Sequence, residues 1–307
     1  MHGSRTKVCI LICTCDRPSY LRALLAELTK QAPDYPIVIV DNGAVPSRLV
    51  ANEFEGGLRV VYDRLQEAGV VTARNRAIHL ALQQAPEFLV FVDDDEVPEP
   101  GWLGHLVGSI EATGADFATG PVHANFLAPP PLWVVKGQFF VRGPDIATGN
   151  LVLRRSCLPK DPNQWFNPKL NFLGAEDEEF LKRLMAQGAR YAPSEKAIVR
   201  EFVPASRLRR SYVFGLGFRD GLQIVQLDAL RGGSRPGRAA RMAWALAAKL
   251  GYGGNHLIWA IRTPWRAVLG VRDFSAAAGI LLGSLGFRAR FYGRNGHAKT
   301  MEAGAGA

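Results

Sequence analysis

Apolar runs typical of buried strands alternate with helix-type leucine patterns along the first half of the chain. The run KVCILICTC at residues 7–15 is apolar and rich in β-forming residues, as expected of a strand buried on both faces. Pro18 then opens a pattern in which leucines recur at i, i+3, i+4 and i+7, which predicts a helix. The alternation continues through PIVIVDNG (36–43), LRVVYD (58–63), TARNRAIHLAL (72–82), FLVFVD (88–93) and WLGHLVGSI (102–110), which is stopped by Gly114. We therefore expect an α/β fold with a mostly parallel central sheet flanked by helices.

Polar side chains gather where three of these strands end. The ends carry Thr14, Asp16 and Arg17, then Asp41 and Asn42, and then Asp93, Asp94, Asp95 and Glu96. Any one of them could be an ordinary turn residue, but α/β sheets bind ligands at the carboxyl ends of their strands, so three polar ends in a row predict a shared site.

We call the last four acids, Asp93 to Glu96, the strand-end cluster. Oxygen-only ligands of the Asp-x-Asp type suit Mg²⁺ or Mn²⁺, completed by water and the oxygens of a phosphorylated substrate. The segment lacks the glycine and the terminal Glu spacing of a calcium-binding EF-hand loop. A solvated acidic loop is the alternative.

A second acidic run, GAEDEEF at 174–180, leads into the helix-type pattern FLKRLMAQG. We call its acids, Glu176, Asp177, Glu178 and Glu179, the helix-start cluster. Acids in a first helical turn complement the helix macrodipole, and a carboxylate on a rigid helix start also suits a general base. Both interpretations stay open. Upstream, residues 145–155 predict a turn and a strand in which Gly149 and Asn150 let a ligand approach the backbone.

The 307 residues suffice for one large domain or a domain with an appendage, and the net charge of +9 is unevenly placed. From Arg231 to Lys299 there are twelve Lys or Arg and one acid, Asp273, which indicates a near-neutral body with a basic C-terminal region. The four cysteines, in no zinc-ligand spacing, predict reduced thiols in a cytosolic protein. Neither a G-x-G-x-x-G after the first strand nor a P-loop motif occurs, which disfavours a dinucleotide oxidoreductase or a P-loop NTPase.

Six sequence blocks follow one another along the chain: CTCDRP, VIVDNG, Gly69 with TARNRAI, FVDDDE, TGNLVLRR and GAEDEEF. In this order they resemble the motifs of a family-2 inverting glycosyltransferase of the GT-A fold. The resemblance covers roughly residues 7–220. The segment at 199–221 is similar to the non-processive branch that builds bacterial exopolysaccharide and related surface glycans. The Q-x-x-R-W signature of processive synthases is absent, and RRSYVF stands in its place, so we expect addition of a single sugar.

The resemblance implies a role for each matching position. Asp177 would be the catalytic base, with Glu176 its neighbour, and Asp95 would be the main metal ligand, with Asp93. The nucleotide-sugar donor would be bound by Cys13, Thr14, Asp16, Arg17, Asp41, Asn42, Gly69, Arg74, Asn75, Asp93, Asp94, Gly149 and Asn150. Many GT-A enzymes supply a late His to the metal. Here Glu201 stands at that place, either as a ligand or in a salt bridge.

The basic C-terminal region predicts either helices lying in a membrane interface or a helical subdomain packed on the body. Its longest uncharged apolar stretch, residues 275–287, is too short to span a bilayer. Nucleic-acid binding is not expected, because no binding motif accompanies the charge. The final MEAGAGA predicts disorder.

These observations predict a GT-A catalytic domain at residues 1–230, with a nucleotide-binding part near 1–120 and an acceptor part near 121–230. A basic helical region follows at 231–307. We expect Mn²⁺- or Mg²⁺-dependent transfer of one sugar, from a donor that is by resemblance UDP-linked, to a glycan or lipid-linked acceptor. The expected location is the cytoplasm, peripheral to the inner membrane. A sugar-nucleotide pyrophosphorylase and an inactive glycan-binding or membrane scaffold are the alternatives.

Overall fold

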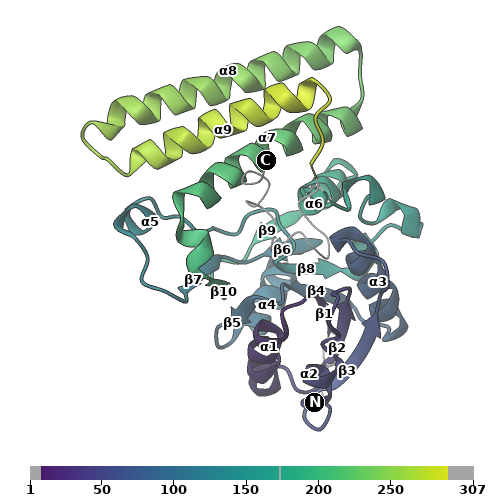
Figure 1. Cartoon of the computed structure of the whole chain (residues 1–307). Coiled ribbons are helices and arrows are strands. Elements are labelled where there is room, and N and C mark those ends of the chain that lie inside the picture. Colours follow the sequence, from purple (N-terminus) through teal and green to yellow (C-terminus); the bar gives the residue numbers. More distant parts are fainter. Residues whose placement is uncertain (1–7, 173, 290–307) are drawn as a thin grey trace.

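A seven-stranded, mostly parallel sheet forms the centre of the protein, whose computed structural model describes residues 8–172 and 174–289 (Figure 1). The strand order is β3-β2-β1-β4-β8-β6-β9, and only β8 runs antiparallel to its neighbours. The strands are β1 (Val8–Thr14), β2 (Pro36–Asp41), β3 (Arg59–Arg64), β4 (Phe88–Val92), β6 (Phe117–Thr119), β8 (Asn150–Arg154) and β9 (Tyr191–Pro193). The expected α/β class and all five expected strands are confirmed.

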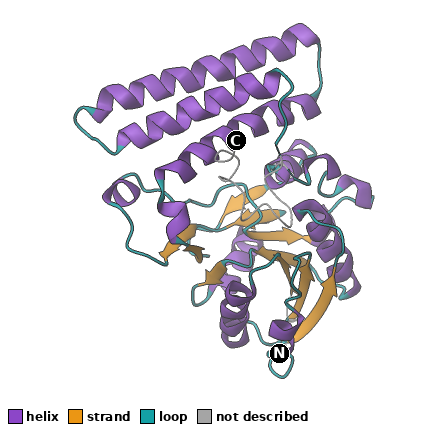
Figure 2. Ribbon diagram, viewed as in Figure 1, coloured by secondary structure: helices purple, strands orange, loops and turns teal. Residues whose placement is uncertain are grey.

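Helices cover both faces of this sheet (Figure 2). Along β1, Ile10 and Ile12 pack into one core cluster, whereas Cys9 and Leu11 pack into the other, because successive strand side chains point to opposite faces. The first cluster is completed by α1 (Pro18–Gln31), α2 (Arg48–Asn52) and α4 (Trp102–Thr113), and the second by α3 (Val70–Gln83) and α6 (Glu176–Ala186). Burial on both faces explains why the strand runs are continuously apolar.

A small second sheet lies beside the end of β4, in the order β5-β10-β7. Its strands are β5 (Glu96–Pro98), β7 (Val122–Phe126) and β10 (Val199–Val203), and its register sets Glu201 opposite Glu96. The short helix α5 (Leu132–Lys136) and four 3₁₀ turns (Arg155–Cys157, Pro162–Gln164, Pro168–Leu170 and Ala205–Leu208) complete the connections. The second sheet therefore brings a distant glutamate next to the strand-end cluster.

Three long helices form a layer over the carboxyl edge of the main sheet: α7 (Arg210–Arg231), α8 (Arg235–Ala260) and α9 (Arg266–Ser284) (Figure 1). Helix α9 packs directly on α7 through glycines. A Cβ on Gly221 would lie 2.1 Å from the Ala276 carbonyl oxygen, and one on Gly279 would lie 2.3 Å from that of Phe218. The two backbones can approach this closely only because these side chains are absent.

Helix α8 lies on α9, on the side away from the body, and only Gly253 of its residues is buried. The expected boundary near residue 230 falls at the turn between α7 and α8, although α9 returns to pack on α7. In the described part of the chain, α9 alone is long and apolar enough to span a membrane by length and composition. Since 44% of that stretch is buried inside the fold, it also fits a core helix. The expected disorder of MEAGAGA lies outside the described residues.

Candidate active site

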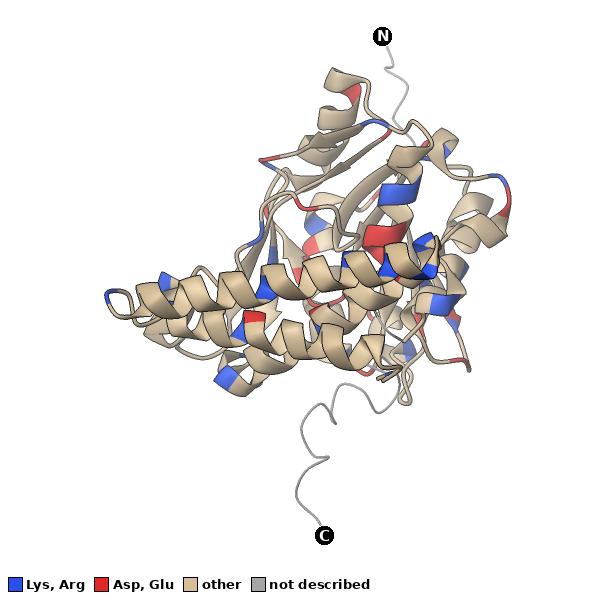
Figure 3. Cartoon of the chain, turned by 90° about the horizontal axis from the view of Figure 1, so that it is seen from above, with Lys and Arg blue, Asp and Glu red and all other residues tan. Residues whose placement is uncertain are grey.

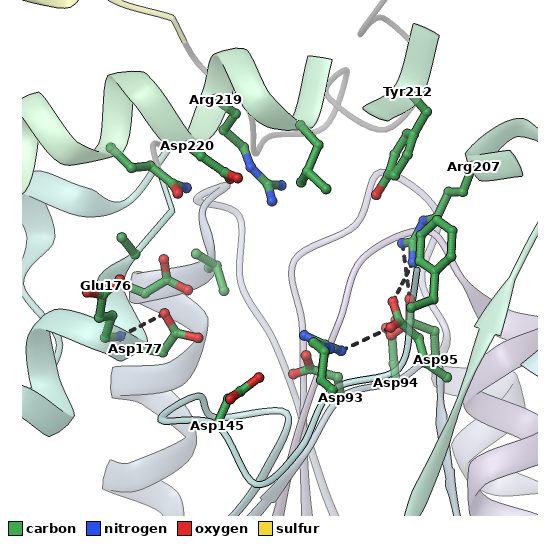
Figure 4. Close-up of a pocket in the computed structure, with 18 of the residues that line it drawn as sticks. Asp93, Asp94, Asp95, Asp145, Glu176, Asp177, Arg207, Tyr212, Arg219 and Asp220 are labelled. Carbon is green, nitrogen blue, oxygen red and sulfur yellow. Dashed lines mark hydrogen bonds and ion pairs between the residues drawn. The ribbon is translucent and has the colours of Figure 1, made fainter. Parts of the chain in front are cut away.

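A cavity of about 660 Å³ opens at the carboxyl ends of β1 and β4, beneath α7 and α9. Both acidic clusters reach it from opposite sides, with Asp177 on one wall and Asp93, Asp94 and Asp95 on the other (Figure 4). The expectation of a shared site at the strand ends holds for the geometry of this cavity. Twelve of the predicted site residues line it: Cys13, Thr14, Arg17, Asn42, Gly69, Arg74, Asp93, Asp94, Asp95, Glu176, Asp177 and Glu201.

Arginines from distant segments neutralise the strand-end cluster. One Arg17 nitrogen donates to Asp94 at 2.9 Å and to Asp95 at 2.8 Å, and the Thr14 hydroxyl donates to Asp94 at 2.8 Å. Arg207, from the turn before α7, donates to the same Asp95 oxygen at 3.4 Å. The carboxylates of Asp94 and Asp95 are nearly buried, so water cannot solvate their charges. The arginines offset the cost of this desolvation.

Glu96 and Glu201 form the outer part of the same network. Arg142 donates to Glu201 at 2.9 Å and lies 3.8 Å from Glu96, while Arg207 pairs with Glu201 at 2.5 Å. Of the two roles expected for Glu201, the salt bridge is therefore the one the structure displays. Metal ligation by Glu201 stays a prediction.

Asp93 differs from its neighbours because its side chain is 45% exposed and faces the cavity. A terminal nitrogen of Arg74 lies 3.5 Å from its carboxylate, and Arg74 also forms a buried ion pair with Glu176. Arg74 therefore connects the two acidic clusters across the base of the cavity.

Asp177 stands at the start of α6 and lines the cavity, whereas Glu176 beside it is buried against Arg74. The Asp177 carboxylate accepts a hydrogen bond from the backbone N–H of Glu178 at 2.8 Å, which orients it. Ala175, just before the helix, has a φ of 63°, an uncommon backbone conformation for a non-glycine residue that turns the chain into α6. Both helix-start acids expected at the site line the cavity, but Asp177 is half-buried whereas Glu176 is buried in an ion pair, and the role of Asp177 as base stays a prediction.

Burial changes the acid–base behaviour of several of these groups. It raises the pKa of Asp94 to about 7 although Arg17 opposes the rise, and it raises the pKa of Glu176 to about 7 although Arg74 opposes it. The pKa of Glu96 is also raised well above its usual value by burial, and the pKa of the Cys13 thiol rises to about 12. The cavity therefore holds carboxyl groups that can carry protons near neutral pH.

Five predicted residues lie outside the lining of the cavity. The Asp41 carboxylate is buried and accepts hydrogen bonds from the backbone of Gly43 and Ser47 and from the Tyr62 hydroxyl. The Asp16 carboxylate accepts from the backbone of Val45, so both acids shape the loop after β2. Their expected roles in binding the donor stay predictions.

Asn75, Asn150 and Gly149 are likewise engaged within the protein. The Asn75 side chain exchanges two hydrogen bonds with the backbone of Phe166, and Asn150 bonds to Trp102, Pro121 and Ala197. A Cβ on Gly149 would lie 2.7 Å from a Glu96 carboxylate oxygen. The backbone at Gly149 therefore approaches the protein's own strand-end cluster, and the expected approach of a ligand there stays a prediction.

The cavity also has walls that the sequence patterns did not predict. Helix α7 contributes Tyr212, Arg219 and Asp220, and α9 contributes Leu269 and Arg272. Asp220 and Arg272 form an ion pair of 2.8 Å that ties the two helices together at the rim. The remaining unpredicted contributors include Asp145, Arg142 and Arg207. For Arg142 and Arg207 the one sequence signal was that the buried acids require cations, and this signal does not identify which arginines supply them.

Carboxylates suitable for a divalent metal are present but engaged. Within the described residues, no three His, Cys, Asp or Glu side chains are grouped so as to hold a metal ion by themselves. Mg²⁺ and Mn²⁺ are commonly held by one or two carboxylates together with water and substrate phosphates. Asp93 and Asp95 fit such an ion in combination with a phosphate ligand, provided that Asp95 is released by Arg17 or Arg207.

The sheet and the cavity define an α/β protein with a cavity at the carboxyl ends of its strands, the place where sheets of this class bind their ligands. A family model, "Glycosyl transferase family 2", matches residues 9–169, just over half of the chain. The chain therefore belongs to glycosyl transferase family 2, which confirms the resemblance and the GT-A class of its fold.

Similar proteins include the succinoglycan biosynthesis protein ExoM of Rhizobium meliloti (strain 1021), which is 28% identical over 297 residues. That match covers 90% of this chain and 92% of ExoM. A crystal structure of S. aureus TarS (residues 1–349) in complex with UDP has a TM-score of 0.49 at 15% identity, covering 92% of this chain and 93% of that one. A structure of GalNAc-T7 with UDP, GalNAc and Mn²⁺ has a TM-score of 0.49 at 16% identity, covering 64% and 44%.

Proposed function

We propose that this glycosyltransferase moves one sugar from a nucleoside-diphosphate sugar to a glycan or lipid-linked acceptor, with inversion, during synthesis of a bacterial surface polysaccharide. The observation that carries the proposal is that Asp177 and the strand-end cluster face each other across one cavity. A diphosphate and an acceptor hydroxyl can then be held on opposite sides of the same sugar. The similarity to ExoM supports an exopolysaccharide as the product.

Asp177 is the proposed base. Both Asp177 and Glu176 line the cavity, but Glu176 is buried in an ion pair with Arg74 and cannot reach an acceptor without breaking it. Asp177 would take the proton from the acceptor hydroxyl as that oxygen attacks the anomeric carbon and the bond to the diphosphate breaks. Arg74, at the base of the cavity, would stay fixed by Glu176 and would offset negative charge on the departing diphosphate.

The donor side is assigned to the strand-end cluster. A divalent ion, held by Asp93 and Asp95 with the donor's phosphates, would neutralise charge on the leaving diphosphate. Arg17 and Arg207 both pair with Asp95, so metal ligation by Asp95 would require rearrangement of at least one of these ion pairs. Uridine is the proposed base of the donor, on the resemblance of Asp41 and its loop to those of uridine-binding members. The proposed location is the cytoplasmic face of the membrane.

Calorimetric titration with UDP, GDP, dTDP and CDP, each with and without Mn²⁺, tests the donor assignment. We expect UDP to bind in the presence of Mn²⁺, to bind more weakly after chelation, and to lose about 100-fold in affinity in Asp95→Ala, equivalent to roughly 3 kcal/mol. Equal binding by wild type and Asp95→Ala would remove Asp95 as a metal ligand. Binding of none of the four nucleotides would favour an inactive scaffold.

A further inference from the structure

A second cavity, of about 550 Å³, lies at one end of the helical layer. We call it the apolar groove, and it is lined by Leu132, Trp133, Arg210, Val213, Phe214, Pro264, Trp265, Ala267, Val268 and Val271. Among these residues only Arg210 is charged, and the others are apolar. The groove is assembled from α5, the first turn of α7, the α8–α9 turn and the start of α9, which lie together at the left of Figure 1.

The apolar groove adjoins the catalytic cavity. Val213 lines both, and on α9 the groove residue Val268 is followed by Leu269, which lines the catalytic cavity. A ligand that occupied both spaces would therefore have a polar part among the acids and an apolar part in the groove. This is the chemistry of an amphiphile rather than of a free sugar.

Side chains at the groove are more exposed than a closed core would allow. Leu132 is 70% exposed and Phe214 is 50% exposed, and Ile261 in the adjoining α8–α9 turn is 86% exposed. Contiguous apolar surface of this kind, next to a functional cavity, marks a site that something apolar covers. An extended peptide is a poor occupant, because side chains of this type offer no partners for its backbone amides.

Positive charge surrounds this end of the molecule. Arg210 is exposed in the groove lining, and Arg266 lies over the rings of Trp259 and Trp265, 5.9 Å and 5.4 Å from their centroids. Arg262, exposed in the α8–α9 turn, is a third basic side chain at this end, and residues 235–289 contain Asp273 as their one acid (Lys and Arg are blue in Figure 3). Tryptophan and arginine side by side suit an interface between hydrocarbon and anionic head groups.

We propose that the apolar groove binds the hydrocarbon chain of a lipid-linked acceptor whose sugar enters the catalytic cavity. The phosphate that joins sugar and chain would lie toward Arg210. The proposal rests on the proposed glycosyltransfer, from which it selects the lipid-linked class of acceptor. It also orients the enzyme, with α5 and the α8–α9 turn facing the membrane from which the chain emerges.

Quenching of tryptophan fluorescence by 12-bromododecyl phosphate tests the groove, since Trp133 and Trp265 line it. We expect saturable quenching of the wild type, most of it lost when both groove tryptophans are replaced by Phe. Leu132→Glu and Phe214→Glu, which place a charge where the chain would lie, should weaken binding at least about tenfold. Leu285→Glu is the matched control, because it also places a charge at an exposed leucine but lies beyond the far end of α9. This variant should bind the probe like the wild type.

The outcomes separate this inference from the proposed function. Unchanged quenching in Leu132→Glu and Phe214→Glu, or quenching that is lost in Trp244→Phe of α8 instead, would overturn the groove as the chain site. Calorimetry with UDP and Mn²⁺ is run on the same proteins, and the groove variants should bind UDP normally. Nucleotide binding without chain binding rejects the groove alone, whereas chain binding without nucleotide binding rejects the proposed donor chemistry and leaves the groove.

Discussion

The strand-end and helix-start clusters each contain four consecutive acids, yet their carboxylates are stabilised in different ways. In the strand-end cluster, Asp94 and Asp95 are nearly buried and depend on Arg17 and Arg207. In the helix-start cluster, Glu178 and Glu179 pair with Lys182 and Arg183 one turn along the same helix. The strand-end acids therefore need partners from distant parts of the chain, whereas most of the helix-start acids find partners on their own helix.

Glu176 is the exception that explains the difference. It is a member of the helix-start cluster, but it is buried and pairs with Arg74, as the strand-end acids pair with their arginines. Burial, rather than the local sequence, therefore decides whether a carboxylate requires a guanidinium partner. Asp177 lies between the two situations, oriented by the helix start but open to the cavity, which is what a base acting on a bound acceptor requires.

The largest expected effect is that of Asp177→Asn, which removes the proton acceptor while keeping the side chain's shape. We expect the rate of UDP release from the donor to fall about 10²- to 10⁴-fold with UDP affinity unchanged. Steady-state kinetics and calorimetry measure the two quantities. Glu179→Gln, two residues along α6 and outside the cavity lining, is the control and should keep the rate. A near wild-type rate in Asp177→Asn would remove Asp177 as the base.

Breaking the strand-end cluster should cost stability. Arg17→Met removes the cation shared by Asp94 and Asp95, and we expect the free energy of unfolding to fall by about 3 kcal/mol at pH 8. The loss should be smaller at pH 5, because Asp94, whose pKa is about 7, can then take up a proton. Urea titration at both values of pH measures this. Arg22→Met, which breaks the exposed pair between Arg22 of α1 and Glu53 just after α2, is the control and should lose much less. Equal losses of unfolding free energy in Arg17→Met and Arg22→Met would show that burial does not make the first ion pair more important than the second.

Glu176→Gln tests whether this acid behaves as a buried one. Burial raises its pKa from 4.5 to about 7, so folding favours its protonated form. The stability that this group contributes is therefore fully present below about pH 4.5 and is lost as the pH rises through 7. We expect the unfolding free energy of the variant to decline less over this window than that of the wild type. Glu55→Gln, at an exposed loop position, should leave the profile unchanged, and parallel profiles for Glu176→Gln would contradict the prediction.

The smallest effect is expected in the locally satisfied part of the helix-start cluster. Lys182→Ala removes the i,i+4 pair with Glu178, whose side chains are 50% and 40% exposed. Such pairs contribute roughly 0.3–0.5 kcal/mol, and alanine is a good helix former, so the net change in unfolding free energy should be close to zero. Urea titration beside Arg17→Met makes the comparison direct. A loss as large as that of Arg17→Met would contradict the division between tertiary and local stabilisation.

Much of the fold could be predicted because its signals are local. The leucine spacing after Pro18 corresponds to the four buried leucines of α1, and the continuous apolar runs correspond to strands buried on both faces. The carboxyl ends of parallel strands meet at one edge, so the residues after β1 and β4 were correctly expected to come together. Asp41 and Asn150 show the limit, because a buried polar side chain can serve a ligand or the protein's own backbone with the same sequence signal.

The sequence by itself determined the strand and helix periods, the family and the two runs of acid that had to be neutralised. Only the tertiary structure decided which cations meet the buried acids of these runs. Arg207 lies 112 residues from Asp95 along the chain, and Arg74 lies 102 residues from Glu176. It also decided that α9, at the far end of the described chain, returns to α7 and helps to form the cavity and its apolar groove. The physical reason is that hydrophobic periodicity acts between neighbours in the chain, whereas burial and ion pairing act between neighbours in space.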